Sequence, residues 1–277
     1  MDNDEIHDIM MNLDLIYVSN PSPLVVLFGP ATSGKTMALI RLSRLLINMG
    51  YLIVPDRSFR PDNHVYNEAC DHFEKLLFSN YAAWCTSGAE TLLVKVIDRK
   101  GEVVCQLLDA PGPFFFDPNI PQEPWHKSID YIRNIQNKRV WLYFVEEGWC
   151  DGETRTRYAQ RIKQHVFDSS RADKSVFVFS KVDNINYLRN RNRLGEVNMP
   201  PELFKAIGYQ YPDIFTPFEN KPPLKWFKQY NCRFVPFSSG FFHKGRDENG
   251  CVYQHYIESH NVYPEQLWKA ILKSVDK

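Results

Sequence analysis

The stretch that decides the fold reads Gly29-Pro30-Ala31-Thr32-Ser33-Gly34-Lys35-Thr36. Two glycines with four residues between them, followed by Lys and Thr, form the pattern of a phosphate-binding loop. Gly29 and Gly34 let the backbone turn closely enough for successive amide N–H groups to surround phosphate oxygens. Lys35 adds a positive charge, and the hydroxyl of Thr36 can coordinate the magnesium ion that accompanies a triphosphate.

The segments on both sides of this loop supply the surroundings that it needs. Residues 24–28 form a continuous apolar run, which is typical of a buried parallel strand. From residue 35 to about 49, apolar side chains recur mostly at helical spacing, and Gly50 marks the end of the segment. A helix that begins at the loop directs the positive end of its dipole at bound phosphates. The sequence therefore predicts a site for a nucleoside triphosphate.

The rest of the chain alternates between apolar runs and amphipathic segments. Further strands are expected at residues 51–54, 91–97, 102–108, 140–145, 175–179 and 233–237, and further helices at 66–78, 122–136, 153–167 and 264–275. This alternation predicts an α/β fold with a mostly parallel central sheet and helices on both faces. We expect a short leader at residues 1–23 and a single domain at 24–277, with inserts near 51–90 and 184–230.

Composition narrows the classes of function. The 277 residues are 44% hydrophobic, which suffices for a large core. Lys and Arg number 33, as do Asp and Glu, so no net charge draws the chain to nucleic acid or an anionic membrane. No apolar run approaches the roughly 20 residues of a membrane span, and the acidic start is unlike a secretory signal. A cytoplasmic protein is expected. The basic residues of the predicted helix 153–167 are expected on a solvated face: Arg155, Arg157, Arg161 and Lys163.

Two motifs downstream of the loop indicate which nucleotide binds. The sequence Asp109-Ala110-Pro111-Gly112 follows the predicted hairpin, where Asp109 would hold magnesium and the Gly112 amide could donate to a γ-phosphate. The sequence Ser180-Lys181-Val182-Asp183 follows a later strand. Its carboxylate can accept two hydrogen bonds from the N1–H and N2–H₂ edge of guanine, whereas adenine offers no such pair of donors.

Two further features complete the predicted base site. Lys181 would lay its aliphatic stem against the purine face. Ser238-Ser239-Gly240 follows the predicted strand 233–237, and its backbone amides could contact the guanine oxygen. Because the phosphate loop and these later segments each follow a strand, we expect them to meet at one edge of the sheet, where ligands of α/β folds bind.

In this order, GKT, DAPG, SKVD and SSG resemble the first, third, fourth and fifth motifs of the Ras-like, translation-factor-related class of P-loop GTPases, over roughly residues 24–275. The resemblance implies binding of GTP or GDP with Mg²⁺, slow hydrolysis, two switch segments that order around the γ-phosphate, and a protein effector or regulator. Ser180 stands where Asn is commonest in that class. The long segment before the hairpin is also similar to that of bacterial GTPases of conflict and signalling systems.

The second motif of that class is a switch threonine that completes the magnesium shell. Thr86 matches it best, and Ser87 and Thr91 are alternatives. Lys35 and Thr86 are therefore the candidate catalytic residues, and Thr36, Thr86 and Asp109 the candidate metal ligands.

Hydrolysis itself has a weaker basis in the sequence. Pro113 occupies the position after DAPG where Ras-like enzymes commonly have a water-orienting glutamine, so turnover is expected to be slow or to depend on a partner. Arg57 or Arg60 could supply an internal arginine finger, although ordinary surface arginines are the simpler interpretation. Phe114-Phe115-Phe116 fits either core packing or a partner surface. Two alternatives to a GTPase stay open: a non-hydrolysing interaction module and a P-loop kinase that uses the insert near 184–230 as a lid.

Overall fold

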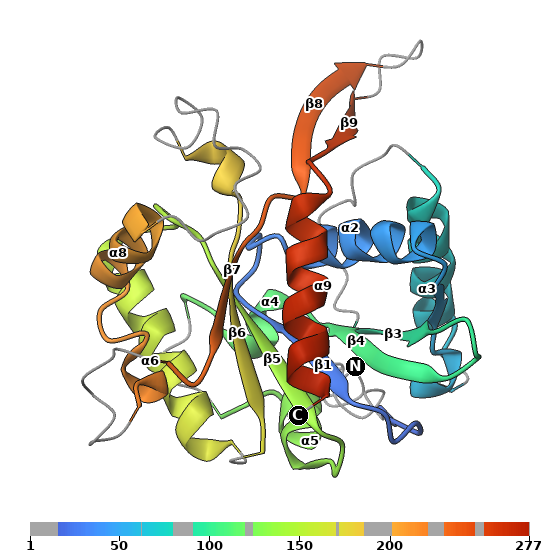
Figure 1. Cartoon of the computed structure of the whole chain (residues 1–277), viewed down its shortest axis with the longest axis horizontal. Helices are drawn as coiled ribbons and strands as arrows, with labels where there is room; N and C mark the ends of the chain where they lie inside the picture. The colour runs from blue at the N-terminus through green and yellow to red at the C-terminus, as the bar shows by residue number, and fades with distance from the viewer. Residues whose placement is uncertain are drawn as a thin grey trace, which may run out of the picture.

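Among the described residues, seven strands form a central sheet in the order β2-β3-β4-β1-β5-β6-β7 (Figure 1). The strands are β1 Leu24–Phe28, β2 Leu52–Pro55, β3 Leu92–Ile97, β4 Val103–Asp109, β5 Arg139–Val145, β6 Lys174–Phe179 and β7 Arg233–Pro236. The pairs β2–β3 and β3–β4 are antiparallel, and the other four pairs are parallel. The predicted α/β fold with a mostly parallel sheet is confirmed.

The computed structural model does not cover the chain evenly. It describes residues 16–61, 63–79, 91–119, 124–169, 172–185, 201–220, 230–246 and 252–276. For residues 242–246 and 252–255 it describes the backbone alone.

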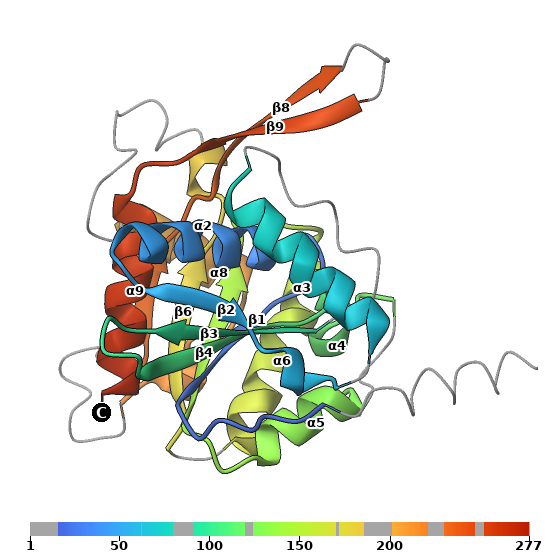
Figure 2. The same ribbon diagram turned by 90° about the vertical axis from the view of Figure 1, so that its right-hand side faces the viewer.

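Helices cover both faces of the sheet. They are α2 Lys35–Asn48, α3 His64–Leu77, α4 Gly112–Phe115, α5 Lys127–Asn134, α6 Gly152–Asp168, α8 Pro201–Gln210 and α9 Val262–Val275. In the two views, α2 and α9 lie side by side on one face, with α3 next to α2, while α5 and α6 lie on the other face (Figures 1 and 2). None of the helices in the described part of the chain is both long and apolar enough to cross a membrane.

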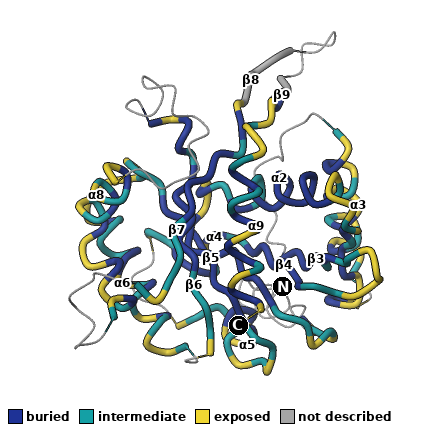
Figure 3. Tube along the Cα trace, in the orientation of Figure 1, coloured by how far each residue is buried: buried dark blue, intermediate teal, exposed yellow. Residues whose placement is uncertain are grey.

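The apolar runs of the sequence become the buried centre of this sheet. β1 and β5 are buried along their whole length, as Figure 3 shows for the middle of the molecule. Burial from both faces explains why these strands read as continuous apolar runs and do not alternate with polar residues. The seven observed strands differ from the predicted ones by no more than one residue at either end.

The helix expected at residues 122–136 is shorter than predicted. It begins after His126, whose Nδ1 accepts from Ser128 N at 3.3 Å, and it ends at Asn134. This side-chain cap satisfies an amide of the first turn and so favours a helix that starts at Lys127.

The phenylalanine run after Gly112 belongs to the core. Phe115 is fully buried with its ring centroid 4.7 Å from that of Phe28, and Phe116 is also buried. The ring of Phe114 stacks on His126 at 3.5 Å. The packing interpretation of this run is therefore the one that the structure supports.

The insert near 184–230 contains elements that the sequence does not predict. Residues 201–210 form α8, and Thr216–Phe218 form a short 3₁₀ turn. Phe215 and Phe218 both pack edge-on against Phe177 of β6 at 5.1 Å. Aromatic side chains of this insert therefore extend the core past β6. Trp226 and Phe227 lie outside the described residues.

A hairpin that the sequence does not predict leaves the body of the molecule. Among the residues that the structure describes, β8 (Gly240–Arg246) and β9 (Val252–Glu258) pair only with each other, and they project beyond the end of the sheet near α2 (Figure 2). Their sequence lacks the alternation of apolar and polar residues that marks a half-buried strand.

The prediction that the basic residues of α6 lie on a solvated face is wrong for Arg155 and Arg161. The guanidinium of Arg161 lies 3.4 Å from the ring centroid of Trp125, and its Nε donates to Phe115 O at 3.0 Å. Arg155 donates to the carbonyl oxygens of Trp149 at 3.0 Å and Gln210 at 3.2 Å. Periodicity places these residues on the polar face of the helix, but other segments cover that face and use their donors.

A buried histidine makes stability depend on pH. His165 of α6 is fully buried with its Nδ1 2.9 Å from the Tyr143 hydroxyl, and burial, followed by the charges of Arg133, Arg161 and Arg139, lowers its pKa well below 6.5. The unfolded chain therefore takes up a proton below about pH 6.5 that the folded protein refuses. The stabilising contribution of the neutral His165 is fully present above that pH. As the pH falls below it, the free energy of unfolding decreases by about 1.4 kcal/mol per pH unit.

Urea denaturation of the wild type and His165→Gln between pH 7.5 and 5.5 checks this expectation. The free energy of unfolding should fall more steeply with acid for the wild type, by about that slope. Identical pH dependence in the two proteins would show that His165 titrates normally.

Candidate functional site

The register of the parallel strands brings the predicted motifs to one edge of the sheet. Asp109 at the end of β4 pairs with Leu27, next to the phosphate loop that follows β1. On the other side of β1, the end of β5 pairs with that of β6, where the segment 180–183 begins. The end of β6 pairs in turn with that of β7, which leads to residues 238–240. The segments predicted to form the site thus leave the sheet side by side.

The phosphate loop is closed upon itself. Thr32 and Gly34 both have left-handed backbone angles, with φ of 62° and 92°, and Gly34 is the Ncap of α2. The hydroxyl of Ser33 donates to Pro30 O at 2.9 Å. Pro30, Ala31 and Thr32 form the rim of the loop, of which Ala31 and Thr32 are exposed and open to a ligand.

Lys35 is folded back across this loop. Its Nζ donates to Gly29 O and Pro30 O, both at 2.9 Å. The side chain is buried, and this burial lowers the pKa of Lys35 to about 8, against an opposing effect of Asp109. A buried ammonium group whose hydrogen-bond partners in the described part of the chain are two carbonyl oxygens has a strong preference for a nearby anion.

Glycine is required where the DAPG turn meets the loop. A Cβ atom on Gly112 would lie 2.0 Å from the backbone nitrogen of Ala31 and 2.4 Å from the carbonyl carbon of Pro30. The two backbones therefore touch, which places the Gly112 amide beside the phosphate loop. Gly29 is also confined, since its Cβ would lie 2.7 Å from Ser33 Oγ.

This contact makes Gly112→Ala a sharp test of the loop. The added methyl group must displace backbone, and overpacking of this kind costs about 1–3 kcal/mol. We expect affinity for nucleotide to fall about tenfold to a hundredfold, measured by titration with a fluorescent nucleotide. Gly152→Ala is the matched control, because a Cβ there meets no atom closer than 3.8 Å. Unchanged binding by Gly112→Ala would mean that the turn does not abut the loop.

Asp109 and Thr36 form the polar pair beneath the loop. The hydroxyl of Thr36 donates to Asp109 Oδ2 at 2.5 Å. The other carboxylate oxygen, Oδ1, is buried and has no hydrogen-bond partner among the described residues. Burial raises the pKa of Asp109, whereas Lys35, the Thr36 hydrogen bond and the backbone amide of Ala110 act in the opposite direction. A buried carboxylate oxygen without a partner next to a hydroxyl fits a hard cation such as Mg²⁺.

The segment after β6 is braced from two sides. Ser180 donates from its backbone nitrogen and from Oγ to Val145 O, at 2.8 and 3.3 Å, so the serine found here in place of Asn ties the segment to β5. Val182 N donates to Phe237 O at 3.3 Å, which ties it to the end of β7. The following Asp183 is only 7% exposed.

Lys181 stands in a left-handed conformation with φ of 55° and makes an ion pair with Glu146 at 2.6 Å. Glu146 is a site residue that the sequence analysis misses. Its one signal is its position directly after the apolar run that forms β5. The pair fixes the course of the lysine side chain across this edge of the sheet.

The last motif, Ser238-Ser239, begins two residues after the end of β7 at Pro236. Phe237 N donates to Phe179 O at 2.8 Å, so the segment starts in register with β6. Ser238 is buried and Ser239 is half-buried. Both carbonyl oxygens accept hydrogen bonds from the end of β9.

Of the three candidates for the switch threonine, the structure describes Thr91 alone. Thr86 and Ser87 lie outside the described residues. The alternative Thr91 is buried, and its Oγ1 has no hydrogen-bond partner among the described residues. It directly precedes Leu92, which pairs with Asp109. Thr91 therefore stands close to the proposed metal ligand, whereas the position of Thr86 stays a prediction.

The residues considered for hydrolysis are also placed. Pro113 lies in the first turn of α4. It occupies the position after Gly112 where a water-orienting glutamine is common, and its side chain offers no group that could orient water. Arg57 forms ion pairs with Asp71 at 2.7 Å and Glu74 at 3.3 Å on α3, which favours the surface interpretation. Arg60 is buried and is not an ordinary surface residue.

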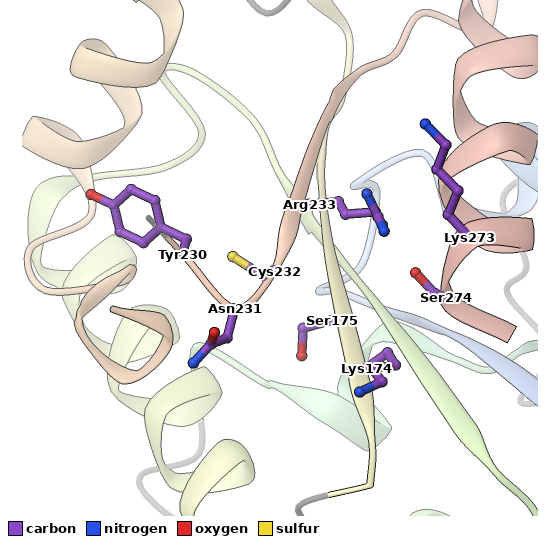
Figure 4. Close-up of a pocket in the computed structure, with 8 residues that line it drawn as sticks. All are labelled: Lys174, Ser175, Tyr230, Asn231, Cys232, Arg233, Lys273 and Ser274. Atoms are coloured by element: carbon purple, nitrogen blue, oxygen red, sulfur yellow. The ribbon is translucent and has the colours of Figure 1, made fainter. Parts of the chain in front are cut away.

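A separate hollow lies at the opposite edge of the sheet, where β6 and β7 begin (Figure 4). It is lined by Lys174, Ser175, Tyr230, Asn231, Cys232, Arg233, Lys273 and Ser274. None of these residues belongs to the predicted site.

Comparisons with known proteins give only remote similarities. No family model matches the chain, and no curated protein matches it. Its fold is similar to that of a Plasmodium falciparum protein named nucleolar GTP-binding protein 1, with a TM-score of 0.39, 13% identity, and 95% of this chain and 90% of that chain covered. The GTP-bound GTPase-like domain of Ski7 from S. cerevisiae gives a TM-score of 0.42 and 15% identity, with 86% of this chain and 45% of that chain covered. At these values no property transfers, and the α/β fold rests on the chain's own strand order.

Proposed function

We propose that the protein binds guanine nucleotides with Mg²⁺ and acts as a slow GTPase switch. The observation that carries this proposal is the shared edge of the sheet, where the phosphate loop, Asp109 and residues 180–183 emerge from neighbouring strands. β6 is the second strand from β1, a separation of about 10 Å at about 4.8 Å per strand. A nucleotide with its phosphates at the loop can reach that strand with its base.

The phosphate end of the nucleotide would lie on the loop. Its amide groups, Lys35 and the dipole of α2 would hold the β- and γ-phosphates, and the Gly112 amide would contact the γ-phosphate. Thr36 and Asp109 would hold Mg²⁺, together with Thr86 as the proposed switch threonine. The ion would supply positive charge that offsets the charge on the phosphate oxygens.

The base end would lie between the segments after β6 and β7. Asp183 would accept from the N1–H and N2–H₂ groups of guanine, and the stem of Lys181 would cover the ring. Ser180 would brace this segment, as its two hydrogen bonds to Val145 O indicate. The amides after Ser238 and Ser239 would face the guanine oxygen.

Direct binding measurements test the proposal. Fluorescent GDP should bind well to the purified protein and fluorescent ADP poorly, because adenine lacks the donor pair that Asp183 requires. EDTA should weaken the binding of GTP through removal of Mg²⁺. Equal affinities for GDP and ADP would overturn the assignment, as would release of an adenine nucleotide from the denatured protein.

A non-hydrolysing module is the second candidate, and Pro113 after Gly112 favours it. A proline offers no donor or acceptor side chain that could orient water. Release of phosphate from GTP should be followed over hours for the wild type, with Lys35→Ala as the background. Release above that background supports a GTPase, and release equal to it supports a module that holds GTP without turnover.

A further inference from the structure

The segment that would read the guanine oxygen is held by the base of the unpredicted hairpin, where β8 begins and β9 ends. The Tyr256 hydroxyl donates to Ser239 O at 2.5 Å, and the Ser259 hydroxyl donates to Ser238 O at 2.6 Å. Ser259 N adds a hydrogen bond to Ser239 O at 3.2 Å. Two consecutive carbonyl groups of the segment 238–240 are thus fixed by residues at the end of β9.

Fixing these carbonyl groups also fixes the amides that would face the base. A trans peptide unit is planar, and its C=O and N–H bonds point in opposite directions. The Ser238 carbonyl shares its plane with the amide of Ser239, and the Ser239 carbonyl shares its plane with the amide of Gly240. Holding both oxygens toward β9 therefore turns both N–H groups away from it.

The segment has little freedom to relax. Gly240 has a φ of 143°, and a Cβ atom there would lie 2.1 Å from Ile257 O. The backbones of residues 240 and 257 are in direct contact, so the segment cannot shift without moving β9.

The end of β9 is in turn anchored on α2, the helix that follows the phosphate loop. Arg41 is 1% exposed and pairs with Glu258 at 3.1 Å, while it donates to Ser259 O at 2.9 Å. Arg44 pairs with the other oxygen of Glu258 at 2.9 Å and lies 5.3 Å from the ring centroid of Tyr256.

Arg44 reaches a third element as well. Its Nη2 donates to the carbonyl oxygens of Leu76 and Ser79 at the end of α3. Two arginines of α2 therefore tie together the end of the hairpin and the end of α3. The side chains of both arginines are buried, whereas that of Glu258 is partly exposed.

We propose that Tyr256 and Ser259 are positioning residues for guanine recognition: they aim the amides after Ser238 and Ser239 at the base, and so set the rate of nucleotide release. This inference rests on the proposed guanine site. It assigns the hairpin a role in retention of the nucleotide, with the Arg41–Glu258 pair joining the base-reading segment to the phosphate-loop helix.

The test removes one hydroxyl from the clamp. In Tyr256→Phe, dissociation of fluorescent GDP should be about fivefold to tenfold faster than in the wild type. Tyr66→Phe is the matched control, since the Tyr66 hydroxyl is also buried and donates to a backbone oxygen, Asp56 O, at 2.9 Å. Equal dissociation rates in Tyr256→Phe and Tyr66→Phe would overturn the inference.

A nucleotide analogue separates positioning from general loosening. In 6-thio-GDP the guanine oxygen is replaced by sulfur, a weaker acceptor, while the N1–H and N2–H₂ groups remain. The ratio of GDP to 6-thio-GDP affinities should be smaller in Tyr256→Phe than in the wild type, because the amides no longer aim at that position. An unchanged ratio would show a structural role alone.

Ser259→Ala provides the second variant and guards against misfolding. It removes a different hydrogen bond of the same segment. The ratio of GDP to 6-thio-GDP affinities should change in the same direction as in Tyr256→Phe. Thermal unfolding of each variant identifies any loss of fold. The two failures are distinguishable: a wild type that binds GDP no better than ADP refutes the proposed function, whereas a GDP-selective wild type with unaffected Tyr256→Phe and Ser259→Ala refutes only the clamp.

Discussion

Replacing Lys35 with alanine is expected to lower the affinity for GDP and GTP by about 10²- to 10³-fold, a loss of the size found when one partner of a buried charge pair is truncated. The Lys35 ammonium group is buried and donates to two carbonyl oxygens at 2.9 Å. Phosphate oxygens bring the negative charge that this buried cation lacks. Titration of wild type and variant with a fluorescent nucleotide measures the change.

Lys174→Ala is the matched control for charge. Lys174 lines the hollow at the opposite edge of the sheet, so its loss removes one positive charge without touching the phosphate loop. We expect the control to bind as the wild type does. Equal affinity for GDP in Lys35→Ala and Lys174→Ala would rule out the loop as the phosphate site.

Asp183→Asn is expected to exchange the base preference from guanine to xanthine. The carboxylate is 7% exposed, and two hydrogen bonds to a charged group in such a site contribute about 1.5–3 kcal/mol each. Their loss should lower GDP affinity by about 10²- to 10⁴-fold. The asparagine amide presents one donor and one acceptor, which suits the oxygen that xanthine carries in place of the guanine amino group.

Competition between GDP and XDP for the same fluorescent ligand measures this exchange. Asp168→Asn serves as the control, because Asp168 ends α6 and pairs with Arg133 at 3.3 Å, away from the strand ends of the site. Loss of both GDP and XDP binding, with the fold retained, would show that Asp183 supports the segment without reading the base.

The sheet can be predicted from the sequence because buried strands are continuous apolar runs and because the motifs follow those strands in order. A strand covered on both faces is apolar throughout, so its ends are visible to within one residue. The parallel strands end at one edge, and hence the motifs that follow β1, β6 and β7 necessarily come together. The motif order therefore predicts that the loop, Asp109 and Asp183 lie at one edge of the sheet, while their roles there stay predictions.

Contacts between segments far apart in the sequence produce no local pattern that would predict them. Arg41 and Glu258 are 217 positions apart, and nothing near either residue indicates that they pair in the structure. The sequence shows no strict alternation of apolar and polar residues over β8–β9, and α8 lies in an insert rich in proline and aromatic residues. Arg161 illustrates the same limit, because its polar position on α6 is covered by Trp125.

The aromatic packing behind Gly112 limits how a nucleotide could act on the rest of the molecule. The ring of Phe115 packs against that of Phe28, and the backbone oxygen of Phe115 accepts a hydrogen bond from the guanidinium of Arg161. Under the proposed function, a γ-phosphate held by the Gly112 amide would therefore be linked to α6 on the other face of the sheet through Phe115 and its hydrogen bond with Arg161.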